Sequence, residues 1–169
     1  MIIYLVGMMG SGKTNLGKKL AKRLSYSFVD TDAEIEKEAQ LSINNIFTHH
    51  GEAAFRKLEQ KQLQKLSTSE NMVVSTGGGL PCYHNNMDLI NKTGTAIYLK
   101  ASPVFLKSRL KNQQKNRPLI ASYNEEELLV FLQQQLSARE AFYEQASIIT
   151  PAINSNTKTI EELILKKKQ

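Results

Sequence analysis

The sequence predicts an α/β fold in which helices cover a parallel β-sheet. Short apolar runs alternate with helical patterns along the whole chain, which is typical of parallel strands joined by helical crossovers. A glycine-rich motif lies directly between the first apolar run and the first helical pattern. Since 169 residues suffice for one compact domain but not for two of ordinary size, we expect a single domain at residues 1–169. The expected strands lie at residues 2–6, 28–29, 72–74, 96–99 and 148–149.

The helices expected between these strands are amphipathic. After the first apolar run, Leu16, Leu20 and Leu24 recur every four residues, so one helix face is apolar and can pack on the sheet. Ser102 followed by proline is typical of an N-cap and a first helical position, which predicts a helix over residues 103–110.

A second leucine stripe predicts a late helix between residues 125 and 144. The same stripe continues to Arg139 and Tyr143, so the arginine points where the leucines point. A buried charge is costly unless it is paired, so Arg139 either extends along the core edge to water or faces a pocket that receives an anion. Between the two helices, residues 112–124 are polar and without periodicity, which predicts a mobile loop. The leucines of the stripe are Leu128, Leu132 and Leu136.

Composition excludes several classes of protein. The single cysteine, Cys82, excludes an internal disulfide and a cysteine-rich metal site. No apolar run approaches the roughly 20 residues of a membrane span, and no leader sequence precedes the first apolar run, so we expect a cytoplasmic protein. The formal charge of +6 suits anionic ligands. Nucleic acid is the generic alternative, but the lysines lie mostly on predicted helix faces, and we expect neither a nucleic-acid nor a membrane partner.

The strongest motif is the phosphate-binding P-loop pattern G-x-x-x-x-G-K-[ST] at residues 7–14, in its required place between a strand and a helix. Its glycines allow the backbone N–H groups to surround phosphate oxygens, and the following helix adds its positive end. Lys13 is expected to reach the β- and γ-phosphates of ATP, and the Thr14 hydroxyl to hold one Mg²⁺. The motif therefore predicts binding of a nucleoside triphosphate, and the remaining motifs must decide what is done with it. The expected ATP-binding residues of the motif are Gly7, Gly10, Ser11, Gly12, Lys13 and Thr14.

Two common classes of P-loop protein do not fit. A GTP switch needs D-x-x-G and N-K-x-D, but the first is absent and the only N-K, at residues 91–92, lacks the final acid. A motor ATPase would place an acid at the end of a strand, whereas the third expected strand ends in Ser75 and Thr76.

The sequence D-T-D at residues 30–32 follows the second expected strand, at the sheet edge where open α/β folds bind ligands. Thr31 and Glu34 have the spacing of a capping box, so we expect them to begin a helix. This leaves Asp32 free to accept a hydrogen bond from a substrate hydroxyl. Asp30 and Asp32 are also candidates for holding Mg²⁺ through water.

Two further patterns are suggestive. Glu52, Arg56 and Glu59 share one helix face, which is either an ordinary surface ion pair or part of a site. Gly77, Gly78 and Gly79 follow a strand directly, and three glycines are costly in a simple turn, which favours close approach of a ligand to bare N–H groups.

Taken in order, these motifs resemble the shikimate kinases. The resemblance runs from the N-terminus to about residue 149. The motifs are G-M-M-G-S-G-K-T at 7–14, D-T-D at 30–32, F-R-K-L-E at 55–59, T-G-G-G at 76–79, R-P-L at 117–119 and R-E-x-x-Y at 139–143.

The resemblance implies a three-layer α/β/α P-loop fold of the nucleotide-kinase type, with a five-stranded parallel sheet. It implies transfer of the γ-phosphoryl of ATP to the 3-hydroxyl of shikimate in aromatic amino acid biosynthesis. A mobile lid would lie at about 112–124 and a helical substrate-binding region at about 32–62. We expect a monomer, with ATP and shikimate as its small-molecule partners.

The resemblance also implies roles for single residues. Asp32 would contact the ring hydroxyls and act as the base. Arg56, oriented by Glu59, and Arg139 would bind the shikimate carboxylate. The glycines Gly77, Gly78 and Gly79 would lie along the ring.

Two arginines are implied on the nucleotide side. Arg117 of the lid would close over the phosphates and act in catalysis with Lys13, and Arg109 would lie near the adenine. The adenine loop should fall near residues 154–158, where no single contact residue can be chosen. The alternatives are a gluconate or nucleoside-monophosphate kinase, or a nucleotide-binding regulatory module without transfer activity.

Overall fold

The computed structural model describes residues 1–112 and 119–167 of the chain, so the expected lid residue Arg117 lies outside the described residues. A five-stranded parallel sheet forms its centre, with the strands in the order β2-β3-β1-β4-β5. The strands are β1 (Ile2–Val6), β2 (Ser27–Asp30), β3 (Met72–Ser75), β4 (Thr95–Lys100) and β5 (Ile148–Pro151). All five lie where the apolar runs predicted them.

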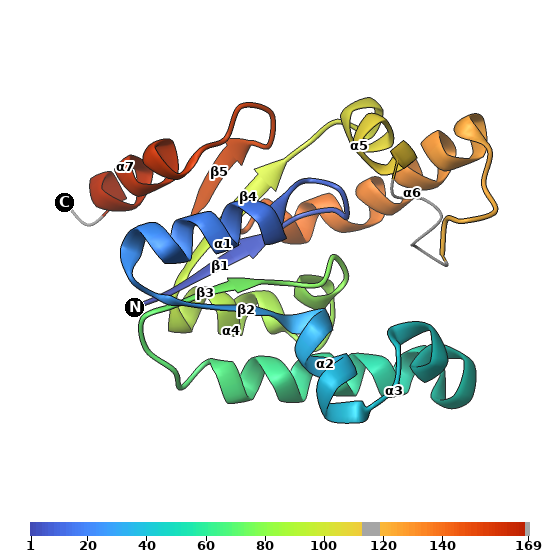
Figure 1. Cartoon of the computed structure of the whole chain (residues 1–169), viewed down its shortest axis with the longest axis horizontal. Coiled ribbons are helices and arrows are strands. Elements are labelled where there is room, and N and C mark those ends of the chain that lie inside the picture. Colours follow the sequence, from blue (N-terminus) through green and yellow to red (C-terminus); the bar gives the residue numbers. More distant parts are fainter. Residues whose placement is uncertain (113–118, 168–169) are drawn as a thin grey trace.

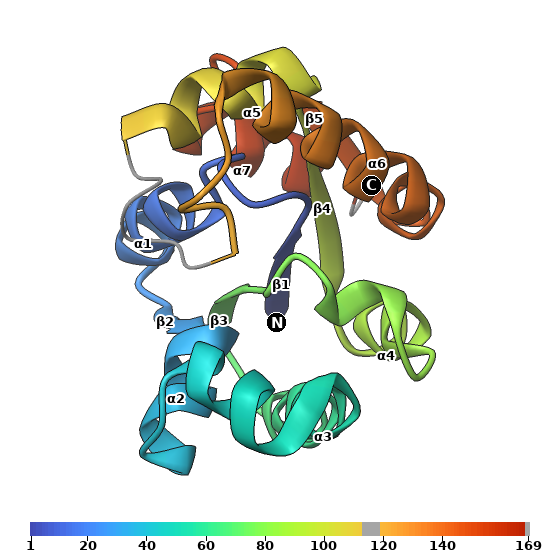
Figure 2. The same ribbon diagram turned by 90° about the vertical axis from the view of Figure 1, so that its right-hand side faces the viewer.

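Helices cover both faces of the sheet (Figures 1 and 2). The central strand β1 shows why, because all five of its residues are buried and its side chains alternate between two cores. Ile3 and Leu5 pack with α1 and α7, whereas Ile2, Tyr4 and Val6 pack with helices α3, α4, α5 and α6. The helices are α1 (Lys13–Leu24), α2 (Thr31–Ala39), α3 (Ile43–Leu66), α4 (Asn86–Thr93), α5 (Pro103–Leu110), α6 (Glu125–Tyr143) and α7 (Thr157–Lys167), with the short 3₁₀ helix η1 (Leu80–Cys82) after β3.

The helix ends confirm one predicted cap, correct another and add a third. The Ser102 side chain caps α5 as predicted, and Asn124, for which no cap was predicted, forms a capping box with Glu127 at the start of α6. The predicted capping box of Thr31 and Glu34 is wrong. The N-cap of α2 is Asp30, whose carboxylate accepts the N–H of Ala33, so Thr31 is the first helical residue.

Helix α3 has a break that the sequence did not reveal. Gly51 has φ of 78° and ψ of 169°, outside helical values, so two helical segments meet there at an angle. The first segment packs with α2 around a small third core of Ile35, Ile46 and Phe55. The break places this α2 and α3 corner beside the C-terminal ends of β2 and β3.

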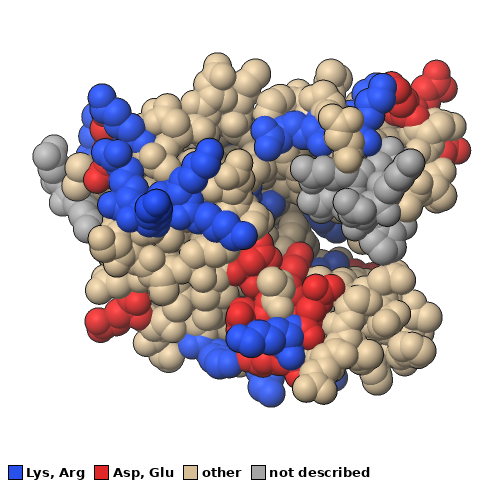
Figure 3. All heavy atoms as spheres, in the orientation of Figure 1, with Lys and Arg blue, Asp and Glu red and all other residues tan. Residues whose placement is uncertain are grey.

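Charge is unevenly distributed over the face seen in Figure 3. Lysine and arginine side chains gather over α1, and aspartate and glutamate side chains gather over α2. A hollow lies beside this acidic group, on the side away from the N-terminus. Within the described ranges, no helix is both long enough and apolar enough to cross a bilayer.

Candidate active site

The P-loop leaves β1 in a conformation that only glycine adopts readily. Gly7, Gly10 and Gly12 have φ of 136°, 81° and 98°, in the region that side chains other than glycine rarely enter. Space is limiting too, because a Cβ on Gly10 would lie 2.9 Å from the Leu110 side chain. The loop therefore curls tightly before α1 and presents backbone rather than side chains to the space it encloses.

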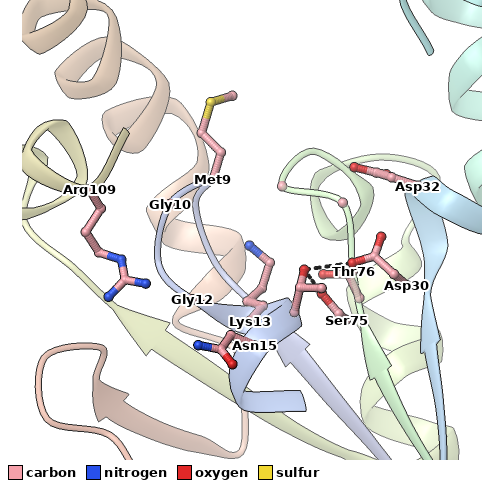
Figure 4. Close-up of a pocket in the computed structure, with 13 residues that line it drawn as sticks. Met9, Gly10, Gly12, Lys13, Asn15, Asp30, Asp32, Ser75, Thr76 and Arg109 are labelled. Carbon is pink, nitrogen blue, oxygen red and sulfur yellow. Dashed lines mark hydrogen bonds between the residues drawn. The ribbon is translucent and has the colours of Figure 1, made fainter. Parts of the chain in front are cut away.

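The side chains that follow this loop point into the same space (Figure 4). The buried Lys13 ammonium donates to the carbonyls of Gly7 and Met8 at 2.8 and 2.9 Å, so it lies across the mouth of the loop. Thr14 donates to the carboxylate of Asp30 at 2.8 Å, and its hydroxyl is 3.3 Å from that of Ser75. Ser75 was not predicted as a site residue. Its position at the end of β3, beside β1, is the only signal that could have found it.

The oxygens of Thr14, Asp30 and Ser75 suit a hard cation that takes few ligands from the protein and the rest from water or phosphate. No cluster of three or more His, Cys, Asp or Glu side chains that could hold a metal ion occurs in the described part of the chain. Mg²⁺ fits this donor set, because it binds through one or two protein oxygens together with water and substrate phosphates.

A cavity of about 200 Å³ joins the P-loop to the ends of β2 and β3. It brings together predicted residues that are far apart in the sequence, from three motifs and from α5 (Figure 4). Its lining includes Gly10, Gly12, Lys13, Thr14, Asp30, Asp32, Gly77, Gly78 and Arg109.

Asp32 extends from the first turn of α2 toward this cavity (Figure 4). Burial, reinforced by the negative charge of Asp30, raises the pKa of Asp32 to about 6, while Lys13 and Arg56 act in the opposite direction. One oxygen, Oδ1, is buried and has no hydrogen-bond partner among the described residues. An acceptor of this kind is costly to bury unless a ligand completes it.

Arg56 lies on α3 and is only 8% exposed, which excludes the alternative of an ordinary surface ion pair. It donates to Glu59 at 2.7 Å, and to Glu52 at 3.2 and 2.9 Å. The Tyr83 ring packs over the guanidinium, 4.2 Å from its central carbon, and the Tyr83 hydroxyl donates to Glu52. The guanidinium is thus held in one orientation with N–H bonds left for a ligand. Tyr83 is a contributor that the sequence gave no reason to choose.

The two glutamates on this arginine differ in their electrostatics. Burial raises the pKa of Glu59 to about 7 despite its bond with Arg56, and its Oε1 is a second buried oxygen without a partner among the described residues. Glu52 is exposed, and the hydrogen bond from Arg56 lowers its pKa. Of the two glutamates, the buried Glu59 is therefore the one that its surroundings destabilise as a carboxylate.

The triple glycine lies between these charged groups because no side chain would fit. A Cβ on Gly77 would overlap the Asp32 carboxylate and lie 3.0 Å from Glu59. A Cβ on Gly79 would overlap the guanidinium of Arg56. The loop is therefore a place where backbone and charged side chains meet closely. The close approach of a ligand that the sequence predicted there stays a prediction.

Arg139 completes this group from α6. The leucine stripe and Tyr143 are buried as predicted, and Arg139 is half-buried. Its guanidinium approaches Gly78, where an added Cβ would be 3.5 Å from Nη1. No ion pair to Arg139 occurs among the described residues, so it faces the loop without an acidic partner of its own.

A second cavity of about 190 Å³ lies on the other side of the P-loop. It is bounded by the P-loop, α1, Leu99 of β4 and the segment after β5 that includes Ser155, Asn156 and Thr157. That segment is where the family resemblance places an adenine loop. Arg109 lines the first cavity only, but it is close to Gly12, which lines both: a Cβ added to Gly12 would be 3.7 Å from the Arg109 guanidinium.

The three histidines, His49, His50 and His84, are exposed and lie outside both cavities. Cys82 is half-buried, and burial raises the pKa of its thiol to about 11, so it stays protonated.

Comparison with known proteins decides the family. The model of the shikimate kinase family matches residues 9–168. The chain belongs to the shikimate kinase family. A shikimate kinase of Azobacteroides pseudotrichonymphae is 48% identical over 148 residues, which cover 87% of each chain. One of Bacteroides thetaiotaomicron is 39% identical over 170 residues, 96% of this chain and 97% of the other.

Solved structures of shikimate kinases superpose closely. A crystal structure from Bacteroides thetaiotaomicron has a TM-score of 0.93 at 37% identity and covers 98% of both chains. A shikimate kinase from Acinetobacter baumannii in complex with shikimate has a TM-score of 0.88 at 34% identity, covering 99% of this chain and 94% of that one. A gluconokinase from Sinorhizobium meliloti is only 16% identical, with a TM-score of 0.55, so it shows the fold alone.

Proposed function

We propose that this protein transfers the γ-phosphoryl of ATP to the 3-hydroxyl of shikimate, giving shikimate 3-phosphate and ADP. The observation that carries the proposal is the single cavity in which the P-loop lysine and Asp32 face one another, with Arg56 and Arg139 around the adjoining glycine loop. Family membership, and a relative solved in complex with shikimate, supply the identity of the acceptor.

On the nucleotide side, the P-loop N–H groups bind the phosphates. Lys13 exchanges its bonds to the Gly7 and Met8 carbonyls for the β- and γ-phosphates, neutralising charge as the phosphoryl moves. Thr14, with Asp30 and Asp32 through water, would hold one Mg²⁺, which would neutralise phosphate charge. The adenine would occupy the second cavity beside residues 155–157, and Arg109, which lines the first cavity, would lie near it. Arg117 would close over the phosphates from a lid at about 112–124.

On the acceptor side, Asp32 accepts the proton of the attacking hydroxyl. A carboxyl with a pKa of about 6 is ionised at neutral pH, yet it is more basic than an ordinary aspartate. As the bond between the substrate oxygen and the γ-phosphorus forms, the bond from that phosphorus to the bridging oxygen of ADP breaks. The proton remains on Asp32. The balance needs no other reactant.

Arg56 and Arg139 would bind the shikimate carboxylate. Arg56 is already oriented by Glu52 and Glu59, and a guanidinium matches a carboxylate with two parallel N–H bonds. The helical region at 32–62 would close one side of the substrate, and Gly77, Gly78 and Gly79 would lie along its ring. We also propose that the single domain acts as a monomer in the cytoplasm, without nucleic-acid or membrane partners.

A coupled assay of ADP release tests the activity. Shikimate, gluconate, AMP and CMP are each added to the protein with ATP and Mg²⁺, and the product is analysed for phosphate on the 3-oxygen. Release of ADP with shikimate alone supports the proposal. Release with gluconate or a nucleotide would favour a different small-molecule kinase, and binding of ATP without any release would favour a regulatory module.

A further inference from the structure

Two motif residues have no part in the proposed chemistry. Thr31 is the middle residue of D-T-D, and Tyr143 is the last residue of R-E-x-x-Y. Both are fully buried, with 0% of the residue surface exposed. The hydroxyl of each forms a hydrogen bond with the backbone of the triple-glycine loop, Thr31 from α2 and Tyr143 from α6.

Thr31 holds the beginning of the loop. Its Oγ1 accepts the N–H of Gly77 at 2.8 Å, a bond between residues 46 positions apart. Gly77 is also the residue against which the carboxylates of Asp32 and Glu59 pack. The bond to Thr31 therefore fixes the loop at the point where its backbone meets the two strained acids.

Tyr143 holds the middle of the loop. Its hydroxyl donates to the carbonyl of Gly78 at 2.6 Å. Burial raises the pKa of Tyr143, so the hydroxyl keeps its proton and remains a donor. Tyr143 lies one helical turn beyond Arg139 on the same face of α6, and the Arg139 guanidinium also approaches Gly78. One helix thus provides both a cation and a hydrogen bond at the same glycine.

The bond at Gly78 determines the direction of the next N–H group. The described chain has no cis peptide bond, and in a trans peptide the carbonyl and the following N–H point in opposite directions. With the Gly78 carbonyl held toward the buried Tyr143, the N–H of Gly79 points away from Tyr143. In the part of the chain that the structure describes, the N–H groups of Gly78 and Gly79 donate to no protein acceptor. Gly78 is half-buried and lines the first cavity, whereas Gly79 is buried beside it.

We propose that Thr31 and Tyr143 are positioning residues that hold the triple-glycine loop in the shape that receives the acceptor substrate. Three glycines in a row would otherwise lose much conformational freedom when the substrate binds. Fixing the loop from both sides in the free enzyme removes that cost. The proposal rests on the proposed function, since the acceptor used to test it is shikimate.

The chain contains a matched control for Tyr143. Tyr98 is 1% exposed, its ring lies 5.2 Å from that of Tyr143, and its buried hydroxyl has no hydrogen-bond partner among the described residues. Tyr143→Phe and Tyr98→Phe each remove one buried oxygen from neighbouring rings, but only the first removes hydrogen bonds: a short one to the Gly78 carbonyl and a weak one to the Met8 sulfur at 3.6 Å. Any general effect of losing a hydroxyl in this core will appear in both.

The measurements are the Michaelis constants for shikimate and ATP and the calorimetric affinity for shikimate. We expect Tyr143→Phe to weaken shikimate binding by roughly three- to tenfold, the loss typical of one hydrogen bond, with the ATP constant unchanged. Tyr98→Phe should match the wild type. Equal shikimate affinity in the two variants, or equal losses for both substrates in Tyr143→Phe, would overturn the role of Tyr143.

Thr31 gives an independent test if Tyr143→Phe does not fold. Thr31→Val keeps the shape but leaves the Gly77 N–H without its acceptor, so it should lower shikimate affinity in the same way. Thr31→Ser keeps the acceptor and should recover most of that affinity. Normal binding by Thr31→Val, or no recovery by Thr31→Ser, would contradict the proposal. The wild type is assayed first, because absence of turnover with shikimate would refute the proposed function itself, whereas an active wild type with unaffected variants would refute only the role of the two hydroxyls.

Discussion

The nucleotide side and the acceptor side of this site are built in different ways. The P-loop is one continuous segment, residues 7–14, and it presents backbone whose shape is set by glycines with positive φ. The acceptor side is assembled from α2, α3, the loop after β3 and α6, and it presents the charged side chains of Asp32, Arg56, Glu59 and Arg139.

The two sides also differ in their electrostatics. The Lys13 ammonium is hydrogen-bonded to two carbonyls of its own loop. Asp32 and Glu59 each have a raised pKa and a buried oxygen without a partner in the described part of the chain. The P-loop also has one buried oxygen without a partner in that part of the chain, Ser11 Oγ, but only the acceptor side holds buried acids with a raised pKa, which stay strained until a ligand supplies donors. The comparison indicates that stability is given up where the acceptor is recognised.

Asp32→Asn should cause the largest loss, and it tests whether the strained acid serves chemistry and not nucleotide binding. The amide cannot take the proton of the attacking hydroxyl, so turnover should fall by roughly 10²- to 10⁴-fold. ATP affinity, measured by calorimetry, should be unchanged. A loss of ATP affinity with normal turnover of the bound fraction would make Asp32 a nucleotide ligand and erase the division between the two sides.

Lys13→Met tests the nucleotide side. The lysine neutralises charge that develops as the phosphoryl moves, so turnover should fall by roughly 10²- to 10³-fold while the circular dichroism spectrum stays that of the wild type. Shikimate affinity should change little. Normal turnover in a folded variant would remove the P-loop from the reaction.

Arg139→Lys keeps the charge but loses the planar fork that suits a carboxylate. We expect the Michaelis constant for shikimate to rise by roughly ten- to a hundredfold, since hydrogen bonds to charged groups are the stronger ones, with ATP affinity little changed. Unchanged shikimate kinetics would leave Arg139 as a helix residue whose side chain extends to water.

The smallest effect expected is on stability, and its sign follows from the raised pKa of Asp32. The folded protein holds the Asp32 proton up to about pH 6, whereas the unfolded chain releases it near pH 3.8. Folding is therefore favoured by this group below about pH 4 and loses that contribution as pH rises to about 6. Asp32→Asn removes the titration, so above pH 6 it should exceed the wild type in unfolding free energy by about 3 kcal/mol. Thermal unfolding at pH 4 and pH 8 measures this, and a gap that does not grow with pH would show that Asp32 is not strained.

The sequence was most informative where structure is local. The P-loop, the five strands and the cap at Ser102 each depend on neighbouring residues, and each lies where it was predicted. The cap of α2 shows the limit of this reasoning. Thr31 and Asp30 were equally able to begin the helix, and the choice fell to Asp30 because the Thr31 hydroxyl is used by Gly77, far along the chain.

The acceptor side was recovered from the sequence mainly through the family resemblance. Spacing placed Arg56 and Glu59 on one helix face but could not show that they are buried. Tyr83, which packs over Arg56, and Ser75, which lies beside Thr14, belong to no local pattern. The break at Gly51 was missed because a single glycine is tolerated in many helices.

The most direct test compares shikimate with its methyl ester, in which the carboxylate is neutral, as substrates of the wild type and of Arg139→Ala. If the acceptor side recognises that carboxylate, the wild type should favour shikimate strongly in kcat/KM, and the variant should lose roughly tenfold or more of that preference. The Michaelis constant for ATP should be the same in both proteins. An undiminished preference for the acid in Arg139→Ala would contradict the assignment of the carboxylate to this cluster.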